Sequence, residues 1–424
     1  MKPITNWVTT VRNYHISTKY ILLWNILFCT GFGSYMVLYN LYLKEVVEPQ
    51  VIGQVVGISY LFYALFSPLA GLLADRIGSR KSLLIGLFLL SCGFIGGVFA
   101  ERSVFLSLWA VLLGVGQSFT IVMFVPILTE YSKPEERLHL FSFAYGLGTF
   151  ATFLGTFGSG IIADQIARWW QVPSLISIRC VILIAACFLL ISTLPLFAMQ
   201  NKRRMVKKEM SQSLEATNGN PSRQSTQAMK QYGITKFLEG LGVGLVIPFM
   251  NLFLANRFGL DTTMISGVLA LATLGTVVMM LCNPRITQKT GEFKTLLLYL
   301  MIGLPCLLVI GTSTNLLFAA LGFLLFRSMF YAMMPIQSKI IMEQVEETKK
   351  GLTSSIGFTT TTIGTGIASP LSMYVVTHYG FYWGYLILFL LSAIFIASSV
   401  GYFYHRFMKK EKLPSSLPMT SLAK

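Results

Sequence analysis

Long apolar runs, separated by short polar segments, recur along the whole chain of 424 residues. Each run is close to the ~20 apolar residues that a helix needs to cross the hydrocarbon core of a bilayer. We count twelve runs and predict one membrane-spanning helix for each. Their approximate limits are 20–43, 52–73, 82–100, 103–128, 139–163, 175–198, 233–255, 264–283, 294–312, 315–338, 351–376 and 381–404. The pattern predicts an all-α membrane protein with twelve transmembrane helices.

Composition and charge placement agree with this prediction. Hydrophobic residues make up 54% of the chain and charged residues only 12%, which leaves too little polar surface for a soluble domain. The net charge of +16 would suit a nucleic-acid partner, but 27 of the 33 Lys and Arg residues fall on one side of the predicted spans. Such a bias orients a protein with its basic loops in the cytoplasm. We therefore expect a multi-pass protein of the cell membrane, with both termini cytoplasmic and no nucleic-acid partner.

The chain contains an internal repeat of six spans. Gly31-Phe-Gly33 followed by Asn40-Leu returns 211 residues later as Gly242-Val-Gly244 followed by Asn251-Leu. A polar, cationic segment at 200–231 separates the copies, and we interpret it as a disordered cytoplasmic linker. We predict an N-terminal half at 1–199 and a C-terminal half at 232–424, arranged as parallel repeats.

One polar loop, between the second and third predicted spans, carries a dense pattern of special residues. They are Gly71, Asp75, Arg76, Gly78, Arg80 and Lys81. We expect Gly71 to allow a close approach between two backbones and Gly78 to permit the tight reversal. The carboxylate of Asp75 is expected to pair with the neighbouring cations or with a helix N-terminus. The alternative is a basic loop that only orients the protein in the membrane.

This loop resembles, position for position, the signature of the major facilitator superfamily of transporters: Gly, three residues, Asp, Arg or Lys, one residue, Gly, one residue and two basic residues. The repeat extends the resemblance over nearly the whole chain. It implies two pseudo-symmetric six-helix bundles, a central cavity lined by the first and fourth spans of each half, and a gate formed by the loop. The resemblance to proton-coupled drug antiporters departs at Ser159 and Gly160, where the antiporter motif has Gly-Pro.

Aromatic residues follow one face of the first predicted span. They are Trp24, Phe28, Phe32, Tyr35, Tyr39 and Tyr42. One interpretation is packing inside the membrane, and the other is a cavity wall for flat apolar or cationic organic molecules. For the cavity we select Phe28, Phe32, Tyr35 and Tyr39, together with Asn251 and Tyr331 from the second half.

Two charged residues lie inside predicted spans, where a charge is costly. Arg327 lies near the middle of the tenth span, and Glu239 lies about six residues into the seventh. Our hypothesis is that Arg327 is a fixed cation and that Glu239 alternates between pairing with it and carrying a proton. The alternatives are an ion pair between Glu239 and Lys236, and donation from Arg327 to helix carbonyl groups.

No enzyme signature is present. The chain lacks a GxxxxGK[ST] nucleotide-binding loop, its four histidines are scattered, and its six cysteines all fall in apolar segments. We expect no enzymatic activity, no cofactor and no metal. The expected function is secondary transport of a small organic solute by a monomer, most specifically proton-coupled efflux of hydrophobic, drug-like compounds. The alternatives are uptake of a small metabolite and a receptor or scaffold that does not transport.

Overall fold

The computed structural model describes residues 14–132, 137–199, 223–346 and 349–411, and every regular element within these ranges is a helix. In chain order the helices are α2 (Ile16–Val46), α3 (Pro49–Ile77), α4 (Ser79–Phe99), α5 (Ser103–Val122), α6 (Phe124–Glu130), α7 (Arg137–Trp170), α8 (Ser174–Ile191), α9 (Thr193–Phe197), α11 (Arg223–Val246), the 3-10 helix η3 (Ile247–Phe249), α12 (Met250–Phe258), α13 (Thr262–Thr290), α14 (Glu292–Thr312), α15 (Leu316–Met342) and α16 (Lys350–Glu411).

These helices form twelve membrane spans. Eleven helical segments of the described residues are long and apolar enough to cross a bilayer. One of them, α16, has 62 residues, or roughly 93 Å at 1.5 Å per residue, about three times the thickness of the hydrocarbon core. It reverses at Gly380, whose φ of 77° lies in the left-handed region that glycine adopts at little cost. Counting α16 as two spans confirms the predicted number.

Helix α11 corrects one predicted boundary. It begins at Arg223, whereas the sequence interpretation placed a disordered linker over 200–231. Residues 223–231 are polar but helical, because a transmembrane helix can extend past the membrane into water while keeping its backbone hydrogen bonds. Residues 200–222 lie outside the described residues.

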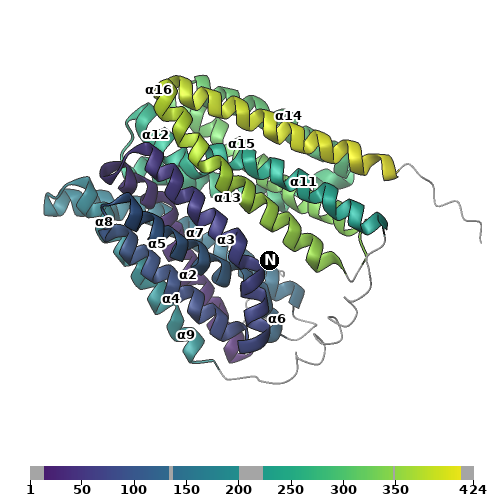
Figure 1. Cartoon of the computed structure of the whole chain (residues 1–424), viewed down its shortest axis with the longest axis horizontal. Coiled ribbons are helices and arrows are strands. Elements are labelled where there is room, and N and C mark those ends of the chain that lie inside the picture. Colours follow the sequence, from purple (N-terminus) through teal and green to yellow (C-terminus); the bar gives the residue numbers. More distant parts are fainter. Residues whose placement is uncertain (1–13, 133–136, 200–222, 347–348, 412–424) are drawn as a thin grey trace, which may run out of the picture.

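The helices gather into two groups that meet at one end (Figure 1). The N-terminal group contains α2 to α9 and the C-terminal group contains α11 to α16. Helix α3 packs against α16, and α7 packs against α13. We call the end where α9 stops and α11 starts the linker end, and the other the distal end. The groups diverge toward the linker end, so the protein has the shape of a V.

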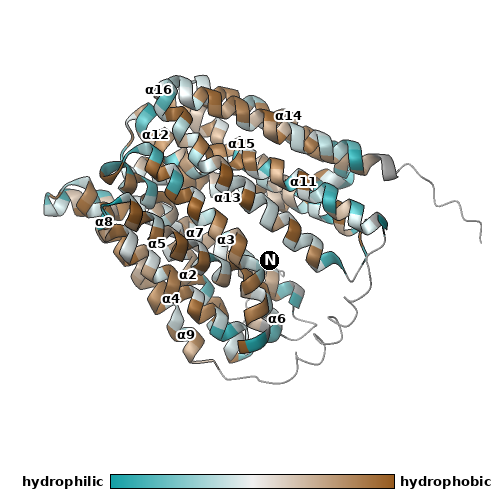
Figure 2. Ribbon diagram, viewed as in Figure 1, coloured by the Kyte–Doolittle hydropathy of each residue, from teal (hydrophilic) through white to brown (hydrophobic). Residues whose placement is uncertain are grey.

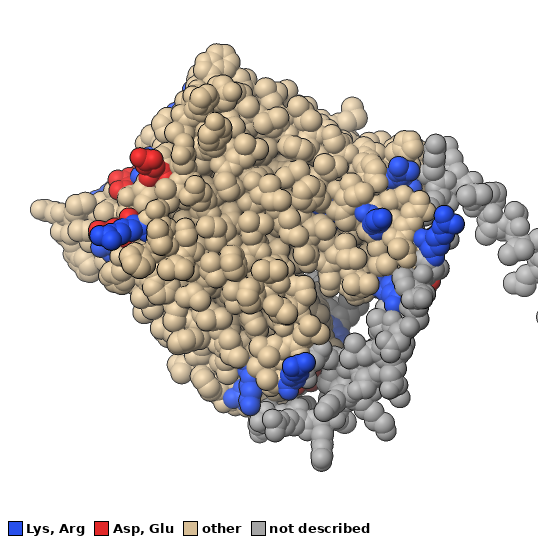
Figure 3. All heavy atoms as spheres, viewed as in Figure 1, with Lys and Arg blue, Asp and Glu red and all other residues tan. Residues whose placement is uncertain are grey.

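The surface has the character expected of an integral membrane protein. Lys and Arg gather at the linker end, acidic and basic residues appear together at the distal end, and a broad belt between the ends is uncharged (Figure 3). Apolar residues cover the outer faces of the helices in the same belt (Figure 2). Leu65, Phe88 and Met301 expose 62%, 62% and 73% of their surface. Apolar surface of this extent is unfavourable in water and is expected where lipid covers the protein.

The repeated glycine motif packs in the same way in both groups. A Cβ atom at the second glycine would lie 2.7 Å from the backbone of a threonine on a neighbouring helix; the pairs are Gly33 with Thr152 and Gly244 with Thr365. The first glycine of each motif faces a carbonyl oxygen of another helix; these pairs are Gly31 with Ala185 and Gly242 with Ser392. Small residues allow the same close helix contacts twice, so the sequence repeat is also a packing repeat.

Candidate functional site

The polar loop that the sequence predicts is a tight turn between α3 and α4, and we call this turn the hinge. Gly78 has a φ of 93° and separates the two helices, because α3 ends at Ile77 and α4 begins at Ser79. Gly291, the equivalent residue in the second repeat, has a φ of 82° between α13 and α14. The reversal predicted at Gly78 is therefore confirmed.

Arg80 has a partner that the sequence did not reveal. Its Nη1 donates to the carbonyl oxygen of Met199 at 2.8 Å, and its Nη2 donates to that of Phe197 at 3.0 Å. These carbonyls belong to the end of α9, which has no further helical turn to satisfy them. A cation at a helix C-terminus also interacts favourably with the helix dipole. The side chain thus ties the hinge to the last span of the N-terminal group.

The rest of the loop differs from expectation at one position. A Cβ atom at Gly71 would have nothing within 4 Å, so the prediction of a close backbone approach there is wrong in this conformation. The physical reason is the divergence of the two groups, which leaves this part of α3 without a close neighbour. Arg76 and Lys81 are exposed, and the side chain of Asp75 lies outside the described residues.

Tyr35 and Tyr39 do not form a cavity wall. The Tyr35 ring stacks on Phe94 of α4 with 3.7 Å between ring centroids, and on Tyr39 with 4.6 Å. Both tyrosines are buried, at 3% and 4% exposure. They pack inside the N-terminal group, so the cavity prediction is wrong for these two residues. Helical spacing places residues on one face but does not say whether that face meets a cavity or another helix.

Phe28 and Phe32 stack on each other with 5.5 Å between ring centroids. Phe28 is also buried, with Trp24 stacked 5.8 Å away on its other side. Phe32 is partly buried. Of the four selected aromatic residues, Phe32 therefore keeps the most surface for a ligand.

Asn251 joins the two groups instead of lining a cavity. Its Nδ2 donates to the carbonyl oxygen of Val37 at 2.6 Å, and Nδ2 of Asn40 donates to that of Pro248 at 2.6 Å. The repeat shift of 211 residues converts Asn40 into Asn251 and Val37 into Pro248. The two hydrogen bonds are thus images of each other, and we call them the asparagine pair.

The asparagine pair belongs to a set of contacts at the distal end. A third hydrogen bond between the groups runs from the backbone N–H of Thr263 to Oδ2 of Asp164, at 2.8 Å. All three bonds lie in the distal half of their helices. They hold the groups together at the end opposite to the one where the groups diverge.

Glu239 is paired, but not with Arg327. Nζ of Lys236 lies 2.6 Å from Oε2 of Glu239 and donates to Oε1 of Gln337 at 2.6 Å. Lys236, Glu239 and Gln337 expose only 5%, 2% and 0% of their surface, and we call them the buried triad. Oε1 of Glu239 and Nε2 of Gln337 have no hydrogen-bond partner among the described residues.

Helix geometry explains why the predicted pair with Arg327 does not form. Gln337 marks the level of the buried triad on α15, and Arg327 lies ten residues earlier on the same helix. At 1.5 Å per residue the two levels are ~15 Å apart, too far for a direct bond between Arg327 and Glu239. Positions counted from the ends of apolar runs do not reveal this separation, because such counts carry an error of several residues at each end.

Arg327 lies where the two groups face each other. Its guanidinium carbon lies 5.6 Å from the ring centroid of Tyr331, one turn along α15. Tyr60 of α3, in the other group, is close enough to interact electrostatically with both residues. All three side chains are half-buried. The structure thus brings together Arg327 and Tyr331, and it adds Tyr60, which the sequence interpretation missed.

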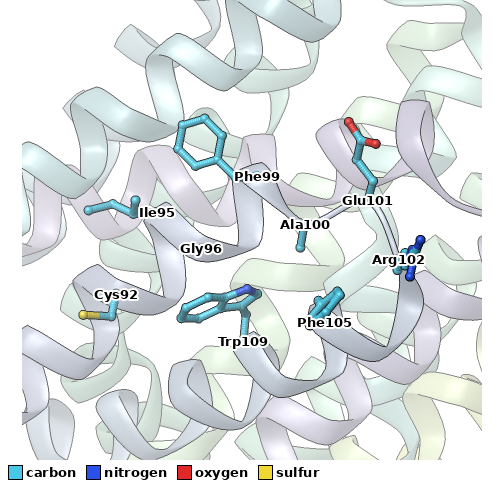
Figure 4. Close-up of a pocket in the computed structure, with 9 residues that line it drawn as sticks. All are labelled: Cys92, Ile95, Gly96, Phe99, Ala100, Glu101, Arg102, Phe105 and Trp109. Carbon is cyan, nitrogen blue, oxygen red and sulfur yellow. The ribbon is translucent and has the colours of Figure 1, made fainter.

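A separate groove of about 650 Å³ lies between α4 and α5 (Figure 4). Its lining residues are Cys92, Ile95, Gly96, Phe99, Ala100, Glu101, Arg102, Phe105 and Trp109. Phe99, Phe105 and Trp109 provide apolar walls (Figure 4). The charged residues Glu101 and Arg102 lie at the turn between α4 and α5. The groove contains none of the residues selected from the sequence. Among the described residues, no cluster of His, Cys, Asp and Glu is suited to bind a metal ion.

Solved structures share this architecture. A bacterial homologue of the human lysosomal transporter Spinster, in an inward-facing and occupied conformation, matches with a TM-score of 0.71 at 14% identity, covering 94% of this chain and 98% of that one. The nucleoside transporter NupG matches with a TM-score of 0.72 at 13% identity, covering 94% and 100%. A D-xylose–proton symporter matches with a TM-score of 0.69 at 15% identity, covering 92% and 97%. At such identities the matches show the fold alone.

The sequence comparison identifies the family. No protein with a curated description matches the chain. The family description of the Major Facilitator Superfamily, in contrast, matches residues 21–230 and 232–419, which together span nearly the whole chain. The first segment covers the N-terminal group and the start of α11, and the second covers the rest of the C-terminal group. The chain belongs to the Major Facilitator Superfamily, whose fold is that of membrane transporters.

Proposed function

We propose that this protein is a proton-coupled secondary transporter of a small organic solute. The observation that carries the proposal is the buried triad. A Lys–Glu pair almost without exposed surface, inside membrane-spanning helices, is costly to keep and commonly marks a proton or substrate pathway. Glu239 also has one carboxylate oxygen without a partner, where a proton can be received.

Protonation of Glu239 changes the balance of charge in the triad. The neutral carboxyl group no longer holds Lys236 by charge, and the ammonium is left with the uncharged Gln337. The packing of α11 against α15 then has a different energy in the protonated and deprotonated protein. For this change to drive transport, the triad must have a different energy in the two arrangements of the groups, and we propose that α11 and α15 shift against each other when the groups rock.

The two groups supply the moving parts. In this conformation the asparagine pair and the Asp164–Thr263 bond hold the groups together at the distal end, while the groups diverge at the linker end. Alternating access requires the opposite arrangement as well, with the distal bonds broken and the linker end closed. We propose that the α3–α4 hinge, including Asp75, Arg76 and Lys81, is the gate that stabilises the second arrangement.

The direction of transport and the class of substrate have two candidate answers, efflux of drug-like compounds and uptake of a small metabolite. The aromatic face of the first span would suit hydrophobic, drug-like compounds, and the burial of Tyr35 and Tyr39 weakens this support for their efflux. Uptake of a small metabolite is the second candidate, favoured by the half-buried cation Arg327, which would suit a polar or anionic solute. We propose that the protein lies in the cell membrane with its linker in the cytoplasm.

The experiment is a proton-flux assay on the full chain reconstituted in liposomes that contain a pH-sensitive dye. Panels of sugars, nucleosides, carboxylates and hydrophobic cations are added outside. We expect at least one class to cause a saturable proton flux in wild-type vesicles, with little flux in the Glu239→Gln variant. The matched control is Glu292→Gln, which removes a carboxylate paired with Lys339 on the surface at the linker end. Solute transport in wild-type vesicles without proton movement would refute the coupling.

A further inference from the structure

Arg327 lacks a polar partner among the described residues, unlike Arg179 and Arg257. Arg179 donates to the hydroxyl of Tyr42 at 3.3 Å, and Arg257 donates to the carbonyl oxygen of Ser313 at 3.4 Å. No hydrogen bond or ion pair joins Arg327 to another residue of the described ranges, and its Nε is buried without a partner. Its guanidinium group lies over the face of the Tyr331 ring.

The depth of Arg327 makes this unusual. It lies eleven residues from the distal start of α15, or ~16 Å along the helix, near the middle of a ~30 Å hydrocarbon core. An arginine at that depth costs at least ~2.5 kcal/mol on insertion scales, and its side chain is too short to reach either surface. The buried triad meets α15 at Gln337, ~15 Å along the helix from Arg327. Lys236 already neutralises Glu239 there.

The surroundings of Arg327 have the chemistry of an anion site. Tyr331 supplies a hydroxyl and a ring from the C-terminal group, and Tyr60 supplies the same from the N-terminal group. A guanidinium group binds a carboxylate or phosphate with two parallel hydrogen bonds, and phenolic hydroxyls donate to the same oxygen atoms. The three side chains are half-buried, so they keep surface for a ligand.

We infer that Arg327, Tyr331 and Tyr60 form the recognition site for an anionic group, a carboxylate or a phosphate, on the transported solute. The inference rests on the proposed transport function and adds the class of substrate. A bound anion supplies the missing counter-charge for Arg327 in the membrane. It also touches both groups at once, so its binding energy depends on how the groups are arranged, as coupling of binding to rocking requires.

Binding is measured directly on the purified full chain in detergent, without transport. The probes are matched pairs that differ in charge: benzoate against benzamide, and glycerol 3-phosphate against glycerol. We expect benzoate or glycerol 3-phosphate to raise the melting temperature of the protein in a saturable manner. The neutral partners, benzamide and glycerol, should have no effect. The pair whose charged member stabilises the protein shows whether the site prefers a carboxylate or a phosphate. Equal stabilisation by charged and neutral partners, or by none of the probes, would overturn the inference.

Variants assign the effect to the site. Arg327→Gln should weaken the responding anion at least ~10-fold, the expected loss for a charge-assisted hydrogen bond, and Arg327→Lys should retain part of the affinity because the charge remains. The matched control is Arg406→Gln, because Arg406 also lies over a tyrosine ring, that of Tyr402 at 5.5 Å, but on the exposed part of α16. Unchanged affinity in both Arg327 variants would refute the site.

The outcome is separable from that of the proton-flux assay. Anion binding that depends on Arg327, together with proton flux that persists in Glu239→Gln, contradicts the coupling role but leaves the anion site intact. Proton-coupled transport of a neutral solute, with no anion binding, contradicts the anion site but leaves the coupling intact.

Discussion

Removal of the asparagine pair should open the distal end. The perturbation is the double variant Asn40→Ala and Asn251→Ala. Each side chain donates one buried hydrogen bond across the groups, to the carbonyl oxygens of Pro248 and Val37. The bonds exist only while the distal end is closed, so their loss destabilises that conformation and not the opposite one.

The magnitude follows from the two bonds. A buried hydrogen bond contributes about 1 kcal/mol net, so the pair contributes about 2 kcal/mol to the closed distal end. That energy corresponds to a ~30-fold change in the ratio of the two conformations. An open population of about 1% in the wild type would rise to about 20% in the double variant. Each single variant should give about half the change in free energy, because the repeat makes the two bonds equivalent.

The assay is a distance measurement between spin labels at the distal end. Lys44→Cys on α2 and Met264→Cys on α13 are exposed positions, one in each group. We expect a longer-distance component to appear in the double variant. The matched control is Asn315→Ala, a third distal asparagine, whose side chain caps its own helix α15 by accepting from the backbone N–H of Leu317. Identical distance distributions in the wild type and the double variant would refute the reasoning.

Two further variants test the charged contacts. Lys236→Met should destabilise the protein by about 3–5 kcal/mol, because it leaves Glu239 buried without a counter-charge. Adding Glu239→Gln should restore part of the lost melting temperature, and a Lys236→Met variant as stable as the wild type would contradict the ion pair. Arg80→Gln should lower the melting temperature by only a few degrees, because its one part-buried and one exposed hydrogen bond near the end of α9 are worth about 1 kcal/mol after screening. A loss of folded protein would show that the contact does more than we assign to it.

The fold was predictable because its signal is repeated. Twelve apolar runs gave the spans in the right order, and the repeated Gly31 and Gly242 motifs correctly indicated two copies with the same packing. The polar start of α11 was not predictable, because the same residues suit a loop or a helix that has left the membrane. Hydropathy detects where a helix meets lipid and not where it ends in water.

The candidate site was predictable in kind but not in detail. The costly charges Glu239 and Arg327 were identified from their positions within apolar runs, and so was the alternative partner Lys236. Which partner Glu239 has depends on ~15 Å of relative depth, and the limits of apolar runs do not fix a depth that closely. Tyr60 carried no local signal at all, because only the packing of the two groups brings it within electrostatic range of Arg327.

Solute exchange and solute accumulation, compared in the same vesicles, test the central claim most directly. The central claim is that the buried triad couples solute movement to protons. With a radiolabelled solute from the responding class, wild-type vesicles should accumulate label against its gradient when a pH gradient is imposed, and should exchange label when no gradient is present. The Glu239→Gln variant should keep exchange near the wild-type rate and lose pH-driven accumulation. Accumulation at the wild-type level in this variant would contradict the claim.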